Sequence, residues 1–408
     1  MALRLAWRSL WRNRRRTLIT VVSIGLGLTF AVFFICFAEG VYHQLMEDVV
    51  RMQAGHVTVQ NKDYLTAPAI DLYVAEAEPL RKRIGELPEV QGTKLLILGQ
   101  GVARSGVGTV GASVVGVEPS IEAKMSILAR HMVKGRYLED ADEALVVVGA
   151  KMAEHLHLAE GKKLVLTTND ASGALTEELF RVAGVFETGV EEIDGYVLQM
   201  PISYARHLYG LPAGSATQVG AILKDSGYET RVLRKVSRLI EGGTDRAYPW
   251  QEIIPEVANY IRVDRGSNYI FQGILLFLIL FTIFNTILMS VLERQREFAV
   301  LLALGTSPWL LRRQIVLESF FIGILGSALG LTLGGLAAYA LEVYGFDITR
   351  LYGQGVSISG AFISPIMHAR VTTATLFWLG VIVIGATLVI SLVPMRRATR
   401  VNIVDELR

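Results

Sequence analysis

Four long stretches without a charged residue constrain this chain more than any other feature of its sequence. They run from Thr17 to Ala38, from Gly266 to Leu292, from Ser319 to Leu341 and from Val371 to Met395. About 20 residues of α-helix, rising about 1.5 Å per residue, cross the roughly 30 Å hydrocarbon core of a bilayer. The chain is also 51% hydrophobic and only 19% charged, which is too apolar for an ordinary soluble protein. The sequence therefore predicts an α-helical membrane protein with four transmembrane helices.

The first stretch could instead be a signal peptide, because arginines precede it and Cys36-Phe37-Ala38 resembles a cleavage site. Its apolar core is longer than the roughly 7 to 15 residues of a signal peptide. We interpret it as a retained span. Cys36 is the single cysteine, so the fold has no disulfide framework.

Arginines predict the orientation. They are Arg4, Arg8, Arg12, Arg14, Arg15 and Arg16 before the first span, Arg294, Arg296, Arg312 and Arg313 between the second and third, and Arg396, Arg397, Arg400 and Arg408 after the fourth. Positively charged loops stay on the cytoplasmic side. Both termini and the linker are therefore expected in the cytoplasm, and the remaining two loops outside.

Nine segments follow from these patterns. They are residues 1–16, a cytoplasmic interfacial helix; 17–38, the first span; 39–265, an outer domain with helical stalks; 266–292, the second span; 293–318, the cytoplasmic linker; 319–341, the third span; 342–370, an outer loop; 371–395, the fourth span; and 396–408, a cytoplasmic tail. The interfacial helix is indicated by Leu3, Trp7, Leu10 and Trp11, which share one face.

The outer domain is predicted to be α+β. Strand-like runs such as HVTVQ at His56, TKLLILG at Thr93, ALVVVG at Ala144, KLVLTT at Lys163 and GYVLQM at Gly195 alternate with helix-like ones such as EAEPLRKRIGEL, GAKMAEHLHL and SGYETRVLRKVSRLI. At its flanks, Gly40 to Met52 and Gln251 to Arg265 are predicted to be helices that continue the first and second spans.

The linker between the second and third spans has strong helix stop and start signals. Gly305 tolerates the left-handed backbone that ends a helix. Thr306 or Ser307 can cap the next helix, and Pro308 suits its first position. The second span is therefore expected to continue into the cytoplasm, break, and restart as a short helix that carries Trp309 and Arg312. Either this element docks on a partner, or its Trp and Arg anchor helix ends at the lipid interface.

The linker RQREFAVLLALGTSPWLLRRQIVLES resembles the permease subunits of mechanotransmission-type (FtsX/MacB-like, type VII) ABC transporters. The stretches WRSLWRNRRRTLITVVSIGLG, VVGVEPSIEAKMSILARHMVKGRYL and SLVPMRRATRVNIVDELR agree with it. The resemblance implies a coupling helix that docks on a separate ABC ATPase. It assigns that contact to Glu297, Leu302, Gly305, Pro308, Trp309 and Arg312.

Within this class the outer domain is most similar to the lipoprotein-releasing Lol permeases (LolC/LolE family). That similarity implies a bacterial inner-membrane protein with a periplasmic outer domain. Its implied partners are a LolD-like ATPase, a second permease that is a paralogue or an identical copy, a lipoprotein substrate and a periplasmic carrier. The segment from Thr167 to Phe180 lacks the proline of the carrier-binding hairpin, which leaves carrier recruitment by this chain open. The alternatives are a MacB-like permease for tripartite efflux and an FtsX-like regulator of cell-wall hydrolases.

Candidate substrate and packing positions lie in the spans. The family resemblance implies that the acyl chains lie between the first two spans. Nearby are the phenylalanines Phe30, Phe33, Phe34, Phe271 and Phe277, which either contact these chains or only face bulk lipid. Gly326, Gly330 and Gly334 form a small-residue face for close helix contact, within the chain or in a dimer. Glu318 at the start of the third span is either a functional carboxylate or an interfacial hydrogen-bonding group.

Other motifs carry little weight. The chain has no G-x-x-x-x-G-K-[ST] loop, so no catalytic residues and no cofactor are assigned, and ATP with magnesium is expected on the partner ATPase. Gly106 to Gly111 matches G-x-G-x-x-G, but strand-like sequence follows it, which predicts a hairpin or bulge. His155 and His157 lack a third ligand, so no metal is assigned. No nucleic-acid partner is expected.

Overall fold

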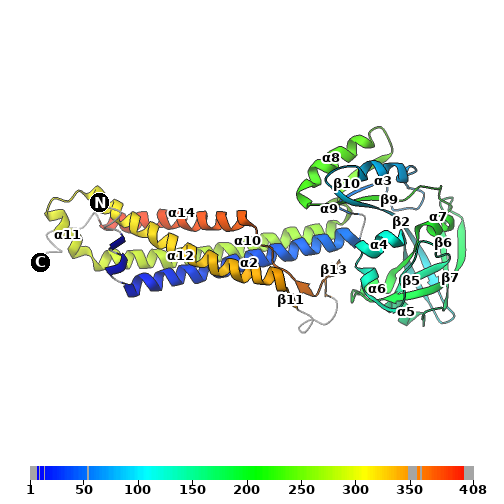
Figure 1. The fold of residues 1–408 in the computed structure, drawn as a ribbon, viewed down its shortest axis with the longest axis horizontal. Helices are drawn as coiled ribbons and strands as arrows, with labels where there is room; N and C mark the ends of the chain where they lie inside the picture. The colour runs from blue at the N-terminus through cyan, green and yellow to red at the C-terminus, as the bar shows by residue number, and fades with distance from the viewer. Residues whose placement is uncertain are drawn as a thin grey trace. The chain divides into compact units, whose positions relative to one another are not determined.

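The computed structural model of the protein describes residues 7–8, 10–12, 14–52, 55–347, 356–358 and 361–398. These residues form two compact units, whose elements are labelled in Figure 1. The membrane unit comes from the described parts of Met1–His43, Arg262–Phe346 and Ile366–Arg408, and the inserted unit from those of Gln44–Ile261 and Asp347–Pro365. Most of the inserted unit therefore falls between the first two apolar stretches, where the sequence predicts the α+β domain.

The described residues contain four helices that are long and apolar enough to cross a membrane. They are α2 (Arg14–Met52), α10 (Pro255–Glu293), α12 (Pro308–Tyr344) and α14 (Thr373–Ala398), and the short α11 (Gln295–Ala303) lies between α10 and α12. Aliphatic residues such as Ile24, Leu28 and Ile283 form a shared core where these helices meet. The predicted fold class, four apolar helices with an α+β domain inserted after the first, is confirmed.

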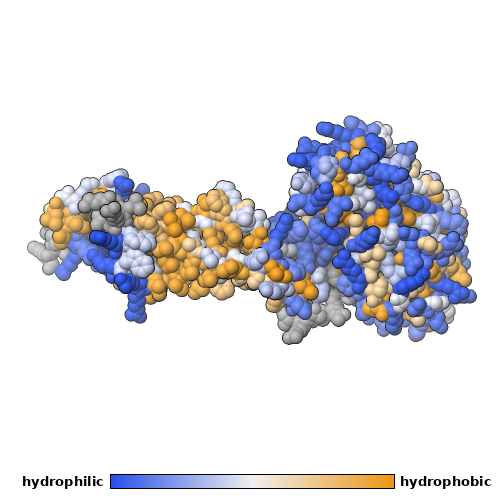
Figure 2. Space-filling model, viewed as in Figure 1, coloured by the Kyte–Doolittle hydropathy of each residue, from blue (hydrophilic) through white to orange (hydrophobic). Residues whose placement is uncertain are grey.

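The outer surface of the membrane unit is apolar. Figure 2 shows hydrophobic residues covering the long helices. Leu18, Phe281, Leu336 and Phe377 are each more than half exposed, and such a continuous apolar surface on a helical bundle fits contact with lipid.

A row of glycines brings α12 close to α2. The glycines and the α2 side chains that they face are Gly326 with Ile24, Gly330 with Leu28, and Gly334 with Val32. A Cβ atom at Gly330 would lie 2.6 Å from Leu28 Cβ and 2.8 Å from the carbonyl oxygen of Gly25. Thr29 adds a polar contact, because its hydroxyl donates to the Gly25 carbonyl at 2.8 Å and lies 3.4 Å from that of Gly330. The absence of a side chain at Gly330 is therefore what allows the two backbones to approach.

Replacing Gly330 with Ala should destabilise the membrane unit by about 1–3 kcal/mol, because the new methyl group overpacks this crossing. The thermal unfolding midpoint of the detergent-purified protein measures the effect. Gly385→Ala is the matched control, since no described atom lies within 4 Å of a Cβ at that position in α14 and Ala favours helix over Gly. Equal midpoints for the two variants would contradict the packing argument.

The inserted unit contains one ten-stranded mixed sheet. Its strands are β1 (Val57–Asn61), β2 (Val90–Arg104), β3 (Thr109–Val117), β4 (Met132–Gly135), β5 (Leu145–Gly149), β6 (Lys163–Asn169), β7 (Leu175–Phe186), β8 (Val197–Pro201), β9 (Gln218–Leu223) and β10 (Asp245–Pro249). The order is β10-β1-β9-β2-β3-β8-β5-β7-β4, and β6 pairs with β2 and β7. The long β2 joins the two halves of the sheet, because its first part pairs with β9 and its second part with β3 and β6.

Short helices complete the inserted unit. They are α3 (Ala77–Gly85), α4 (Pro119–Met125), α5 (Ala150–His155), α6 (Glu191–Tyr196), α7 (Ile202–Leu208), α8 (Glu229–Leu239) and α9 (Trp250–Ile253), with 3-10 turns η1 (Leu128–Arg130) and η2 (Ser226–Tyr228). Between α12 and α14 lie the short strands β11 (Phe346–Asp347), β12 (Val356–Ile358), β13 (Ala361–Ile363) and β14 (Ile366–Met367). The five strand-like and three helix-like runs named from the sequence form elements of the predicted type, except that Gly195 and Tyr196 belong to the end of α6 and β8 begins at Val197.

One local prediction for the inserted unit is also confirmed. The G-x-G-x-x-G match lies at a β-hairpin, in which Arg104 of β2 pairs with Thr109 of β3. The segment from Thr167 to Phe180 is the β6–β7 hairpin, and its turn is closed by Asp170, whose carboxylate accepts from the amide groups of Ser172 and Ala174.

A buried lysine holds the last turn of α2 in the inserted unit. Lys94 of β2 is 1% exposed, and its Nζ donates to the carbonyl oxygen of Arg51 at 2.7 Å. Glu122 Oε2 lies 3.6 Å from the same nitrogen. Burial lowers the pKa of Lys94, and Glu122 opposes that shift. A cation at a helix C-terminus also interacts favourably with the helix dipole.

The predicted helix from Gln251 to Arg265 is wrong in one respect. The structure has two helices there, because α9 ends at Ile253 and α10 begins at Pro255. Proline has no N–H to donate and disfavours the helical conformation in the residue before it, and Ile254 has φ −128° and ψ 69°. The predicted continuation of the first span from Gly40 to Met52 does form part of α2.

Some predictions fall outside the described residues. Leu3 and most of the predicted tail, residues 399–408, are among them, as are residues 348–355 and 359–360 of the outer loop. Of the predicted interfacial face, Leu10 is buried, whereas Trp7 and Trp11 are 42% and 47% exposed. The Trp7 ring lies edge-on to Phe321 of α12, with ring centroids 5.4 Å apart.

Candidate functional site at the turn between α11 and α12

The turn between α11 and α12 has a defined backbone geometry. The amide of Thr306 donates to the Leu301 carbonyl and that of Gly305 to the Leu302 carbonyl, each at 3.0 Å. This pair of bonds is the Schellman motif, which needs a left-handed residue after the helix, and Gly305 has φ +85°. Ser307 then precedes Pro308, which occupies the first turn of α12. The turn is thus closed by its own hydrogen bonds.

The predicted order of helices in the linker needs correction. The second span does not continue unbroken to Gly305, because α10 ends at Glu293 and α11 begins at Gln295. The helix that starts at Pro308 is not short, because α12 runs on through the third span to Tyr344. The sequence from Trp309 to Glu318 has no Gly or Pro, so nothing in it stops the helix before the span.

One side of α11 is buried. Phe298 is 2% exposed and Ala299 is fully buried, and Phe298 packs with Leu311 and Ile315 of α12 in the core of the membrane unit. Because residues three to four apart share a helix face, this packing fixes which side of α11 points away from the core.

The remaining surface of α11, the residue that follows it and the start of α12 expose apolar side chains. The exposed fractions are 43% for Val300, 38% for Leu301, 78% for Leu304, 63% for Trp309 and 42% for Leu310. Several of these residues line a groove of about 700 Å³ together with Arg12, Arg296 and Gln314. Clustered apolar side chains rimmed by polar groups commonly mark a protein-binding surface. We call these five residues the apolar turn.

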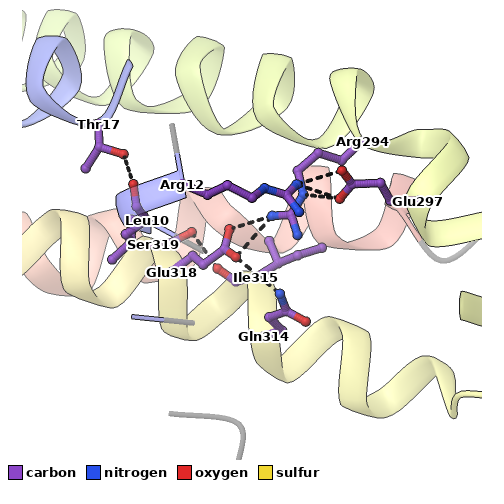
Figure 3. Close-up of polar contacts among 9 residues, drawn as sticks. All are labelled: Leu10, Arg12, Thr17, Arg294, Glu297, Gln314, Ile315, Glu318 and Ser319. Atoms are coloured by element: carbon purple, nitrogen blue, oxygen red, sulfur yellow. Dashed lines mark hydrogen bonds and ion pairs between the residues drawn. The ribbon is translucent and has the colours of Figure 1, made fainter. Parts of the chain in front are cut away.

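An ion-pair network lies beside the apolar turn (Figure 3). Arg12 Nη2 lies 2.7 Å from both carboxylate oxygens of Glu297. Arg294 joins two carboxylates, because its Nε donates to Glu297 at 3.1 Å and its Nη1 donates to Glu318 at 3.1 Å. Gln314 Nε2 donates to Glu318 at 3.3 Å. The network therefore links the N-terminal segment, α11 and the start of α12.

The two ends of the network differ in burial. Side chains of Arg294 and Glu318 are 14% and 13% exposed, whereas those of Arg12 and Glu297 are 60% and 47% exposed. The hydrogen bond from Arg12 lowers the pKa of Glu297 below its ordinary value, although partial burial opposes this shift. Charge pairs are screened much less when water is excluded, so the Arg294–Glu318 pair should contribute more to rigidity.

The exposed ion pair between Arg12 and Glu297 is expected to contribute little to the free energy of unfolding. Arg12→Gln should reduce the free energy of unfolding by at most about 1 kcal/mol, because exposed ion pairs contribute little. Since the folded-state pKa of Glu297 is lowered, the stabilisation is present above the carboxyl's unfolded pKa and is lost as pH falls through the lowered value. Unfolding of both proteins at pH 7 and at a pH below the lowered pKa of Glu297 measures it; a difference that persists at that lower pH would contradict this assignment.

The predicted ATPase-coupling residues lie around this turn. Pro308 and Trp309 begin α12, Glu297 belongs to the network, and Arg312 is exposed on α12. Leu302 is half-buried, and it shares a face of α11 with Phe298, four residues earlier. Sequence reasoning missed Leu304, the most exposed apolar residue of the turn, and it did not pair Arg294 with Glu318. An arginine directly after an apolar span and a carboxylate at the start of the next were the available signals.

Three of the five candidate substrate phenylalanines are in contact with one another. The rings of Phe34 on α2 and Phe271 on α10 pack edge to face, with centroids 6.1 Å apart. Phe33 contacts Phe34 at 5.7 Å. Phe30 and Phe277 are 58% and 65% exposed and take no part in this pair. Glu318, left open between a functional carboxylate and an interfacial group, forms the ion pair with Arg294 described above.

Two protein-family models match the sequence. The MacB-like periplasmic core domain matches residues 17–238, and the FtsX-like permease C-terminal domain matches residues 269–403. The first match alone covers more than half of the 408 residues. The chain belongs to the FtsX/MacB-type ABC transporter permeases. The resemblance read from the linker is thereby confirmed.

Several named relatives of this permease are similar over most of its length. The lipoprotein-releasing system transmembrane protein LolC of Neisseria meningitidis is 22% identical over 405 residues, covering 96% of this chain and 94% of the relative. LolE of Haemophilus influenzae is 21% identical over 418 residues, covering 98% and 97%. The pyoverdine export ATP-binding/permease protein PvdT of Pseudomonas syringae is 26% identical over 361 residues, covering 83% of this chain and 52% of the relative.

Proposed function

We propose that this permease extracts lipoproteins from the outer leaflet of the bacterial inner membrane and passes them to a periplasmic carrier. The observation that carries the proposal is the similarity to LolC over 96% of the chain and 94% of the relative, which includes both the spans and the inserted domain. LolE supports it over a similar share of both chains. The identities are low, so the proposal also rests on how the parts of the structure would work together.

In this proposal ATP and magnesium bind to a separate LolD-like ATPase. The permease contributes the apolar turn, whose exposed Leu304 and Trp309 would fill a groove on that ATPase. Two ATPases would act with two permeases, which are identical copies or paralogues. The arginines near the turn favour a cytoplasmic position for it, with the termini on the same side and the inserted domain in the periplasm.

Closure of the ATPase dimer would displace the apolar turn. The buried Arg294–Glu318 pair, at 3.1 Å, would make α11 and the start of α12 move together rather than separately. Glycine contacts between α12 and α2 would pass that displacement to α2, whose last turn is fastened to the sheet by Lys94. Work done on the ATPase would thus reach the periplasmic domain without a channel across the membrane.

Acyl chains would enter beside α2 and α10. Phe34 and Phe271 are 44% and 47% exposed although their rings touch, so both present an apolar face at the surface of the membrane unit. A second permease would complete a cavity there. Lipid-exposed phenylalanines are common in spans, so the contact between rings of two different helices is what distinguishes these two residues from the other candidates.

Export of a periplasmic substrate is the second candidate function. The observation that favours it is the similarity to PvdT, at 26% identity over 83% of this chain. In that case the inserted domain would bind an adaptor protein rather than a lipoprotein carrier.

Co-purification distinguishes lipoprotein extraction from export. The tagged permease, isolated from native membranes and analysed by mass spectrometry, should bring down an ATPase and triacylated lipoproteins, and the reconstituted complex should release lipoprotein to a carrier only with ATP. An ATPase with a periplasmic adaptor and no lipoprotein would favour export. Recovery of no ATPase would reject both candidates.

A further inference from the structure

A large groove lies within the inserted domain, on one face of its sheet. Its volume is about 1170 Å³, above the upper end of the range of about 300–1,000 Å³ for small-molecule sites. Strand residues such as Leu96 and Leu98 line it, together with residues 64–65, 68–71, 168–173 and 252–257. The mechanism proposed above does not use this groove.

Two buried glutamines line the groove side by side. Gln60 of β1 and Gln218 of β9 are directly opposite in the antiparallel register, and they are 0% and 3% exposed. Gln218 Nε2 donates to Gln60 Oε1 at 2.8 Å. Among the described residues, neither Gln60 Nε2 nor Gln218 Oε1 has a hydrogen-bond partner. The pair therefore leaves one donor and one acceptor unsatisfied, which is unfavourable for buried amides.

The unsatisfied atoms have a specific chemical complement. An amide N–H can donate to Gln218 Oε1 while a neighbouring carbonyl accepts from Gln60 Nε2. If both side-chain amides were turned over, the pair would still offer one donor and one acceptor. An extended polypeptide backbone presents alternating N–H and C=O groups. The free donor and acceptor of the two glutamines could bind these backbone groups whatever side chains the peptide carries.

The charge of the groove further limits the class of ligand that it can bind. Its charged lining residues are Asp71, Asp170, Glu252 and Glu256, and none of its described lining residues is basic. Phosphate groups are usually held by Arg or Lys, so lipid headgroups and nucleotides do not suit it. Asp170 is engaged in its own turn and Glu252 lies 3.8 Å from Arg246, which leaves Asp71 and Glu256 as the acidic groups best placed to attract a cation.

We propose that this groove binds an extended, neutral or basic polypeptide segment, with its backbone on Gln60 and Gln218. The inference rests on the proposed function, for it supplies a site for the polypeptide part of an acylated cargo. It separates two tasks within one permease, because the acyl chains would be held in the membrane unit and the peptide chain in the inserted domain.

Binding of unacylated peptides tests the groove separately from lipoprotein release. The probe is a fluorescent 12-residue peptide of Gly, Ser and Lys, added without ATP to the full permease complex in nanodiscs. An analogue N-methylated at alternate residues lacks half of the backbone N–H groups and should bind at least tenfold more weakly. A version with Asp in place of Lys should also bind more weakly, with a difference that shrinks at high salt because salt screens charge.

Variants of the permease complete the test. The double variant Gln60→Leu/Gln218→Leu should remove the difference between the normal and N-methylated peptides. Gln91→Leu, the same change at an exposed β2 residue outside the groove, should retain it. If the double variant does not fold, the comparison of the peptides on the unmodified complex decides.

Equal affinities for the normal and N-methylated peptides, or no binding of either at millimolar concentration, would overturn the inference. The failures are distinguishable. Lipoprotein release without peptide binding would reject the groove alone, whereas peptide binding without ATP-driven lipoprotein release would reject the proposed function and leave a polypeptide site in place.

Discussion

Leu304→Glu should weaken the association of this permease with its ATPase about 30-fold or more while leaving the permease folded. Leu304 is 78% exposed and directly precedes the left-handed Gly305, so a charged side chain there meets water in the free permease and costs little stability. In a complex the same carboxylate would be buried in an apolar contact without a partner. Burying a charge without a partner costs about 2 kcal/mol or more, so affinity should fall about 30-fold or further.

The measurement is the amount of ATPase recovered with the tagged permease, together with ATPase activity of the purified complex. Tyr344→Glu is the matched control, because that side chain is 84% exposed at the other end of α12 and receives the same charge. The control should retain the ATPase. Normal recovery with Leu304→Glu would show that the ATPase docks elsewhere and that the apolar turn has another role.

Backbone signals at this turn were readable from the sequence because they belong to single residues. Glycine is one of the few residue types that adopt a positive φ at low cost, and Gly305 has φ +85°. Proline is tolerated in a helix mainly in its first turn, where Pro308 lies. The hairpin at the G-x-G-x-x-G match was readable for a similar reason, since strand-like residues follow the glycines. Each of these conclusions needs only a few neighbouring residues.

Ion pairs between residues far apart in the sequence could not be predicted in this way. Arg12 and Glu297 are 285 residues apart in the sequence, and the sequence contains many other arginines and carboxylates that could have paired. No Gly or Pro lies at the break between α10 and α11 at Arg294, so the sequence has no helix-breaking residue that predicts it. Its guanidinium contacts Glu297 and Glu318 and lies 5.1 Å from the Phe298 ring centroid, so tertiary contacts accompany this break.

The difference between Leu302 and Leu304 has the same origin. Both are apolar residues near the end of α11, but Leu302 is four residues after Phe298 and so shares its helix face, whereas Leu304 does not. Packing of Phe298 against α12 fixes the rotation of α11, which leaves Leu302 half-buried and Leu304 exposed. Which face of a short helix points outward is therefore decided by its neighbours.

Glu318→Leu should destabilise the membrane unit and, under the proposed function, uncouple ATP hydrolysis from lipoprotein release. Removing this carboxylate takes away the 3.1 Å partner of Arg294, whose side chain is only 14% exposed. Leaving a largely buried donor unsatisfied costs about 1–3 kcal/mol. The unfolding midpoint in detergent should fall accordingly, by more than that of Arg12→Gln.

The double variant Arg294→Met/Glu318→Leu separates structure from transmission. Replacing both members of a buried ion pair by apolar residues is often neutral for stability, so the midpoint should recover. If the pair also makes α11 and α12 move together, the double variant should still hydrolyse ATP but release less lipoprotein per ATP than the unmodified complex. Full recovery of release along with stability would mean that the pair only holds the fold, and the displacement would then have to pass through the apolar packing of Phe298 and Leu311.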